Sequence, residues 1–290
     1  MSAPAIEVVS ERRAELGEGP AWDSRSSELA WVDITAGRVC FLGPGGAERT
    51  VEVGQPVSAV VPRASGGHVL ALRDGFAALA DDGTVTTLAH VEHDRPGNRM
   101  NDGKCDRHGR LWAGTMAFDE TPGAGALYRL DADGTVSTIL EGVTISNGLA
   151  WSRDERAMYY IDTPTQRVDQ LDYDPASGAV ENRRPLFEIP PAAGSPDGMA
   201  LDAEGFLWVA LYGGGAVRRY APDGALDRVI ELPATCVTSC AFGGPELEDL
   251  YITCARHGLS PEQLTREPLA GALFHHRPGV AGLPTESFGG

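Results

Sequence analysis

Asp106-Arg107-His108-Gly109-Arg110-Leu111-Trp112 is a turn that leads into an apolar segment, and the chain repeats it as Asp202-Ala203-Glu204-Gly205-Phe206-Leu207-Trp208. In both copies an Asp opens the segment, a Gly follows, and a Trp ends it. Asp and Gly favour a tight turn, and the apolar residues after it are typical of a β-strand. A unit that recurs along a chain indicates a repeat architecture.

Four weaker copies of this unit occur elsewhere, at residues 27–31, 65–70, 154–159 and 246–251. One large apolar residue can be aligned across all six copies: Trp31, Val69, Trp112, Tyr159, Trp208 and Tyr251. Successive aligned residues lie about 38 to 49 positions apart, the length of one four-stranded propeller blade. The repeat therefore predicts an all-β fold, a six-bladed β-propeller with four antiparallel strands in each blade.

The segments between these units carry the signals of the remaining strands. Asp82-Gly83, Asp133-Gly134 and Asp223-Gly224 are hairpin turns next to alternating apolar and polar residues. The segment Ile6-Glu7-Val8-Val9 is available to complete the last blade. We therefore expect the N-terminal and C-terminal strands to close the ring together, which removes an exposed sheet edge.

Helical periodicity is almost absent, and residues 260–264 predict only one short helical turn. No linker or shift in composition divides the chain, so we expect a single domain over residues 1–290. The final Gly289-Gly290 is expected to fray, as chain ends commonly do.

The composition excludes several classes of protein. A formal net charge of -17 argues against nucleic-acid binding, which needs clustered Lys and Arg. No apolar segment approaches the ~20 residues of a membrane span, and Met1-Ser2-Ala3-Pro4 does not begin a signal peptide. The five cysteines include no CxxC pair and are predicted to be free, buried thiols. We expect a cytoplasmic protein with no nucleic-acid or membrane partner, and a monomer by default.

Four polar residues occupy matching places in their repeats, each on a small-residue loop just before an apolar segment: Glu18, Asn101, Asn147 and Asp197. Singly, Asn147-Gly148 and Asp197-Gly198 are typical of ordinary turns. Because the loops at one end of a propeller converge on its axis, the matching positions instead predict one shared site. Carboxylate and amide oxygens are the ligands that hard divalent cations such as calcium, magnesium or manganese prefer.

The most distinctive polar segment is Asn98-Arg99-Met100-Asn101-Asp102-Gly103-Lys104, which runs on to Gly114-Thr115-Met116. Together with Gly17-Glu18-Gly19-Pro20 and residues 255–260, it makes the chain resemble the SMP-30/gluconolactonase/luciferin-regenerating-enzyme family, specifically its bacterial sugar-lactonase branch. The resemblance covers nearly the whole chain. It implies a six-bladed propeller, in agreement with the repeat, and one bound divalent metal ion.

The resemblance also implies which residues hold the metal ion. Glu18, Asn147 and Asp197 match the metal ligands, and Asp197 is in addition the candidate general base. The ion could be calcium, zinc, magnesium, manganese or iron(II), because an oxygen-rich site accepts several divalent ions. Asp102 and Lys104 are interpreted as residues that brace their loop.

Four positions are candidates for substrate binding. Arg99 and Asn101 match the substrate-contacting positions of the family. Asp119 falls where some relatives have a Glu near the substrate, and Tyr212 falls where relatives often have Trp. Arg and Asn side chains carry the donors and the acceptor needed to hold sugar hydroxyls and lactone oxygens.

The implied function is hydrolysis of a sugar lactone, of the gluconolactone, xylonolactone or arabinonolactone type, to the aldonic acid. In that reaction the metal ion is a Lewis acid and Asp197 takes a proton from the attacking water. No GxSxG nucleophile motif is present, which counts against a serine hydrolase. Two alternatives stay open: a phosphotriesterase-like hydrolase on the same scaffold, and a non-catalytic propeller that binds calcium or sugar.

Overall fold

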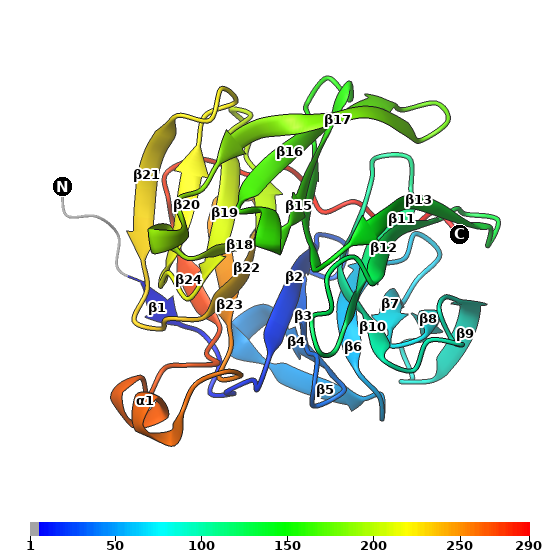
Figure 1. The fold of residues 1–290 in the computed structure, drawn as a ribbon. Coiled ribbons are helices and arrows are strands. Elements are labelled where there is room, and N and C mark those ends of the chain that lie inside the picture. Colours follow the sequence, from blue (N-terminus) through cyan, green and yellow to red (C-terminus); the bar gives the residue numbers. More distant parts are fainter. Residues whose placement is uncertain (1–5) are drawn as a thin grey trace.

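The computed structural model describes residues 6–290, and these form six four-stranded antiparallel sheets arranged as the blades of a propeller (Figure 1). The first strand of each blade contacts the first strands of the two neighbouring blades, so that these strands line the central axis. The innermost strands are β2 (Gly17–Asp23), β6 (Val57–Pro62), β10 (Asn98–Cys105), β14 (Ser146–Trp151), β18 (Ser195–Leu201) and β22 (Val237–Gly243). The predicted six-bladed propeller is confirmed.

The other strands follow outward in chain order within each blade. The second strands are β3 (Glu28–Asp33), β7 (His68–Leu72), β11 (Leu111–Ala117), β15 (Ala157–Asp162), β19 (Leu207–Tyr212) and β23 (Asp249–Cys254). The third strands are β4 (Arg38–Leu42), β8 (Gly75–Leu79), β12 (Gly125–Leu130), β16 (Arg167–Asp174), β20 (Ala216–Tyr220) and β24 (Phe274–His276). The outermost strands are β5 (Glu48–Glu52), β9 (Val85–His90), β13 (Val136–Val143), β17 (Ala179–Glu188), β21 (Leu226–Glu231) and β1 (Glu7–Val8).

The two ends of the described chain meet in the last blade. Strand β1 pairs antiparallel with β24, with Glu7 opposite His275 and Val8 opposite Phe274. The sheet order β22-β23-β24-β1 therefore combines strands from both ends of the sequence. The ring closure predicted from residues 6–9 is confirmed.

The aligned apolar residues of the repeat all lie on second strands, as their spacing predicts. Trp112 and Trp208 are fully buried, and the indole Nε1 of each donates to the Asp that opens its repeat. The distance from Nε1 to the carboxylate of Asp106 or Asp202 is 2.9 Å in both blades. The turn and the core Trp are thus one structural unit, which explains why they recur together.

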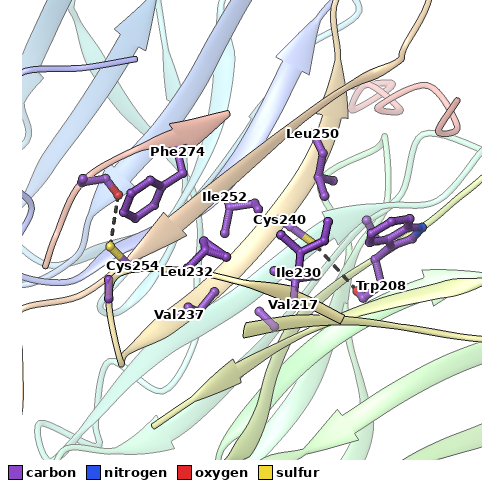
Figure 2. Close-up of a cluster of buried hydrophobic side chains, with 14 of the residues drawn as sticks. Trp208, Val217, Ile230, Leu232, Val237, Cys240, Leu250, Ile252, Cys254 and Phe274 are labelled. Atoms are coloured by element: carbon purple, nitrogen blue, oxygen red, sulfur yellow. Dashed lines mark hydrogen bonds between the residues drawn. The ribbon is translucent and has the colours of Figure 1, made fainter. Parts of the chain in front are cut away.

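Apolar side chains pack between neighbouring blades. Figure 2 shows Trp208 and Val217 of the fifth blade against Ile252 and Phe274 of the sixth. The thiol of Cys240 in this cluster donates to the Trp208 carbonyl at 3.7 Å. All five cysteines are free and buried, which confirms the prediction from their spacing.

The short helices lie outside the blades. The α-helix α1 (Pro261–Arg266) begins after Ser260, whose hydroxyl accepts the Gln263 N–H in a capping box. The predicted helical turn is confirmed. Three single-turn 3-10 helices in loops complete the set in residues 6–290: η1 (Pro44–Gly46), η2 (Thr163–Thr165) and η3 (Pro191–Ala193). Within the same residues, no helix is long and apolar enough to cross a membrane.

The C-terminal segment crosses one end of the ring, and Figure 1 shows it in red running from the β24 blade to the opposite side. The Ala203 N–H donates to the Ala281 carbonyl at 2.9 Å, and the Phe288 N–H donates to the Pro62 carbonyl at 2.8 Å. At its tip the Gly289 N–H donates to the Gly109 carbonyl at 2.9 Å. The expectation that Gly289-Gly290 frays was wrong, because these backbone hydrogen bonds hold the end against several blades.

Candidate functional site

The four residues predicted to share a site lie at irregularities near the beginning of four innermost strands. Strand pairing shifts register between Glu18 and Ala21, Met100 and Gly103, Asn147 and Leu149, and Pro196 and Met199. Such a β-bulge bends the strand and re-aims a side chain, and bulges are common beside active sites. The site residues therefore belong to the strands themselves. The expectation that they sit on loops before the strands was wrong, because the bulge gives the turn-like local sequence.

Glycines after two of these residues let neighbouring innermost strands approach closely. A Cβ atom at Gly148 would lie 2.8 Å from the Asp197 carbonyl oxygen. A Cβ atom at Gly198 would overlap the side chain of Ser239 on the next strand. The Asn-Gly and Asp-Gly pairs thus serve close packing at the axis, and this packing brings the polar side chains together.

A chain of hydrogen bonds links the third, fourth and fifth blades. Arg99 Nη1 donates to Asn101 Oδ1 at 2.6 Å, and Asn101 Nδ2 donates to Asn147 Oδ1 at 2.9 Å. Asn147 Nδ2 in turn donates to Thr163 Oγ1 at 2.7 Å, and this hydroxyl donates to the Pro196 carbonyl at 2.8 Å. The chain fixes both amide groups, and it leaves Asn147 Oδ1 with one lone pair to offer a further partner.

The two carboxylates of the site are buried with few donors. Glu18 is 6% exposed and Asp197 is 7% exposed. The carboxylate of Glu18 accepts the Gly19 N–H at 2.8 Å, and that of Asp197 accepts the Gly198 N–H. Burial, followed by the charge of Asp102, raises the pKa of Glu18 to about 8. Burial and then the charges of Glu18 and Asp102 raise the pKa of Asp197 well above its ordinary value.

Two cationic side chains lie near these carboxylates. Arg99 is 8% exposed, and burial lowers its pKa to about 10 although Glu18 and Asp197 oppose that shift. Lys104 Nζ donates to the Met199 carbonyl at 2.5 Å, and burial lowers the pKa of this ammonium group too. The carboxylates therefore lie in a water-poor environment with incomplete compensation of their charge.

Glu18, Asn147 and Asp197 fit a hard divalent cation by the chemistry of their donors. They offer two carboxylates short of hydrogen-bond donors and one amide oxygen held in place. In the described part of the chain, no three His, Cys, Asp or Glu side chains converge closely enough to hold a metal ion. The set thus depends on the Asn147 amide, and the third nearby carboxylate, Asp102, does not complete a three-acid cluster.

Asp119 and Tyr212, the two remaining candidates for substrate binding, have different surroundings in the structure. Asp119 is exposed, and its Oδ1 accepts the N–H and the hydroxyl of Thr121 at 3.1 and 2.7 Å, so it caps its own turn. Tyr212 is half-buried, and this burial raises the pKa of its hydroxyl, with the charges of Asp197 and Glu120 among the smaller causes. Its hydroxyl donates to the His257 carbonyl at 2.6 Å.

Glu120 is a residue that the sequence reasoning missed. Its φ of 57° lies in the left-handed region, which turns the chain sharply after Asp119. The charge of Glu120 also acts on Arg99, whereas Asp119 is not among the causes of the Arg99 pKa shift. Glu120 lies in a loop outside the repeat, so no periodic signal in the sequence marks it.

A cavity of about 100 Å³ lies further along the same innermost strands. Asp102, Lys104 and Cys240 line it from the blades, and residues 283–286 of the C-terminal segment line it as well. Glu18, Asn147 and Asp197 are not among its lining residues. The candidate site is therefore defined by the converging polar side chains and not by this cavity.

Comparison with known proteins shows extensive similarity along the whole chain. The family model described as SMP-30/Gluconolactonase/LRE-like region matches residues 16–256. Regucalcin of Xenopus laevis is 42% identical over 299 residues, with 100% of each chain covered.

Two solved structures are also very similar to this one. A luciferin-regenerating enzyme superposes with a TM-score of 0.93 at 34% identity, with 99% of each chain covered. A calcium-binding protein, regucalcin, of Agrobacterium tumefaciens superposes with a TM-score of 0.95 at 30% identity, covering 98% of this chain and 97% of that one. The matched family model and the full-length similarity lead to one conclusion: the chain belongs to the SMP-30/gluconolactonase/LRE-like family.

Proposed function

We propose that the protein is a metal-dependent lactonase that opens a small sugar lactone to its aldonic acid. The observation that carries the proposal is the Arg99–Asn101–Asn147 hydrogen-bond chain, together with the buried carboxylates of Glu18 and Asp197, whose charges act on Arg99. This arrangement combines polar groups that can bind a hydroxylated substrate with oxygen ligands for a divalent ion. Membership of a family whose model carries the name gluconolactonase supports lactone hydrolysis in general.

Glu18, Asn147 and Asp197 are the proposed ligands of one divalent ion. When bound there, the ion would supply Lewis-acid polarisation of the lactone carbonyl. Calcium is favoured, because the set is entirely oxygen and the similar Agrobacterium tumefaciens regucalcin is described as a calcium-binding protein. Zinc, magnesium, manganese and iron(II) are the alternatives, to be compared in the same assay.

The roles proposed for the other residues are supported by the surroundings of their side chains. Asp197 takes the proton of the attacking water, since a carboxylate in a buried, negatively charged environment is a stronger base than one in water. Arg99 and Asn101 orient the lactone, and their mutual hydrogen bond holds them ready before the substrate arrives. Asp119 and Tyr212 remain predicted substrate contacts, and Glu120 joins them as a candidate.

The test is a proton-release assay on chelator-stripped protein with a panel of aldono-1,4- and 1,5-lactones. Each divalent ion is added back separately, and Asp197→Asn is compared with the exposed control Asp172→Asn. We expect metal-restored turnover that the control retains and Asp197→Asn loses. No turnover of any lactone with any ion would remove the proposal.

A phosphotriesterase-like hydrolase is the second candidate. Arg99, a buried cation beside a candidate metal site, also suits a phosphoryl oxygen. Adding activated phosphorus esters to the panel distinguishes a lactonase from a phosphotriesterase-like hydrolase, because the preferred substrate has the higher kcat/KM. A protein that binds calcium but turns over neither class would be the non-catalytic alternative.

The cellular setting is likewise a proposal. All five thiols are free and buried, which suits a reducing compartment, so we infer a cytoplasmic protein. Its partner would be the small lactone itself, and the chain would act as a monomer. Size-exclusion chromatography with light scattering checks the monomer.

A further inference from the structure

We propose that Asp102 and Lys104 form a buried charge pair that sets the affinity of the site for its divalent ion without contacting that ion. This inference rests on the metal site of the proposed function. It assigns opposite roles to the two residues: Asp102 strengthens ion binding, and Lys104 weakens it. Bracing of the strand, the simpler reading of these residues, would give them the same role.

Both residues lie on β10 just past the site residues of that strand. Asp102 is 6% exposed inside the β10 bulge, and the Gly103 N–H donates to its Oδ1 at 2.7 Å. Lys104 lies two residues further on and reaches across the axis, where Nζ donates to the carbonyl of Met199 at 2.5 Å. Met199 belongs to β18, the strand that carries Asp197. Lys104 therefore links β10 to β18 at a point further along each strand than Asn101 and Asp197.

The position of Asp102 argues against a role as a ligand. It lines the 100 Å³ cavity together with Lys104, and Glu18 and Asp197 do not line that cavity. Among residues 6–290 no third acidic, His or Cys side chain joins those two carboxylates in a metal-binding cluster. Asp102 is thus placed to influence the site by its charge and not as a ligand.

The pair lies next to the proposed ligands along the strands. Asp102 follows Asn101, whose Nδ2 donates to Oδ1 of the proposed ligand Asn147 at 2.9 Å, and Lys104 donates to the carbonyl of Met199, two residues beyond the proposed ligand Asp197. With all groups ionised, the carboxylates of Glu18, Asp102 and Asp197 exceed the cations of Arg99 and Lys104 by one charge. Removing Lys104 makes this cluster more negative, and removing Asp102 makes it neutral. Because charge–charge interactions are strong in a water-poor interior, either change alters the attraction of a divalent cation.

The experiment measures Ca²⁺ and Mn²⁺ binding to chelator-stripped protein by titration calorimetry, without any lactone. We expect Lys104→Met to bind each ion about tenfold more tightly and Asp102→Asn to bind it about tenfold more weakly. The double variant should return close to the wild-type affinity. Arg38→Met and Glu52→Gln make the same charge changes in an exposed pair on β4 and β5, and they should leave the affinity unchanged.

Affinity shifts in the same direction for both single variants, or no shift in either, would overturn the proposal. If Lys104→Met does not fold, the double variant is compared with Asp102→Asn, and its failure to bind more tightly would also overturn it. Opposite shifts in a protein that turns over no lactone would sustain the charge pair while the lactonase proposal fails. Lactone turnover without opposite shifts in ion affinity would sustain the lactonase proposal while the charge-pair proposal fails.

Discussion

Two groups of buried carboxylates lie in this propeller, and they differ in how fully they are hydrogen-bonded. Asp106 is 1% exposed, and its carboxylate accepts from Arg110 Nε at 2.7 Å, Trp112 Nε1 at 2.9 Å and the Tyr173 hydroxyl at 2.8 Å. Asp202, at the matching place two blades further on, is fully buried and is bound in the same way by Trp208 Nε1 and Arg219 Nε.

Glu18 and Asp197 lie in the bulges at the axis and lack such partners. Each accepts one neighbouring backbone N–H, and burial raises the pKa of both. A buried carboxylate can accept several hydrogen bonds, so one with a single donor and a raised pKa marks a place where a ligand or a proton is expected. Burial alone therefore does not separate structural acids from candidate functional ones, whereas the number of hydrogen-bond donors does.

The largest expected effect is on catalysis. Asp197→Asn should lower kcat on the best lactone by about 100-fold or more, because the amide cannot take a proton from water. The same variant should keep or raise the melting temperature of the metal-free protein, since it removes a carboxylate from a negatively charged cluster. Kinetics and differential scanning fluorimetry on one preparation check both parts. A large loss of stability would place Asp197 with the structural acids and break the comparison.

The opposite pattern is expected at the fully bonded acid Asp202. Asp202→Asn should reduce the free energy of unfolding by about 3–5 kcal/mol, because it leaves the buried Arg219 guanidinium without its innermost partner. Urea unfolding measures this loss. Asp227→Asn changes a partly exposed partner of the same Arg219 and should change stability far less. Equal losses in the two variants would show that burial of the partner does not matter here.

The fold was predictable because its signals are local and repeated. The Asp–Gly turn and the Trp that bonds to its Asp recur in the second strands, and residues 6–9 supply an apolar strand with no other partner. The C-terminal segment was not predictable. Its backbone bonds to Pro62, Gly109 and Ala203 depend on where the ring places those residues, and no period in the sequence marks them.

The grouping of four candidate residues was predictable because it follows the repeat. Glu18, Asn101, Asn147 and Asp197 stand in matching positions, and the structure brings them to one end of the innermost strands. The bulges were not predictable, since one extra residue in a strand leaves no mark beyond a turn-like sequence. Glu120 was missed because its direction depends on a left-handed backbone in a loop outside the repeat.

A smaller effect concerns pH and metal removal. The pKa of Glu18 is raised to about 8 in the folded, metal-free chain from the ordinary value of 4.5. The folded state thus holds this proton more tightly than the unfolded state does, so stability is fully present at low pH and decreases as pH rises from about 5 to about 8. We expect the melting temperature of metal-free protein to fall over that range more steeply than that of calcium-loaded protein.

The same raised pKa predicts proton release when the ion binds. Calorimetry of Ca²⁺ binding at neutral pH in buffers of different ionisation enthalpy should detect about one proton released per ion. A melting temperature that rises with pH in the metal-free chain would contradict the assignment of Glu18 as an under-bonded acid.

The smallest expected effect is on KM, and it concerns two exposed acids, Asp119 and Glu120, on the loop between β11 and β12. Asp119 already accepts two hydrogen bonds from Thr121, whereas the charge of the adjacent Glu120 acts on Arg99. Glu120→Gln should therefore raise KM for the lactone by about three- to tenfold with kcat little changed, as expected for lost uniform binding. Asp119→Asn is the matched control and should change KM less. A larger KM effect at Asp119 would restore the role that the family resemblance implies for it. It would also show that the number of hydrogen-bond donors separates structural from functional acids only where those acids are buried.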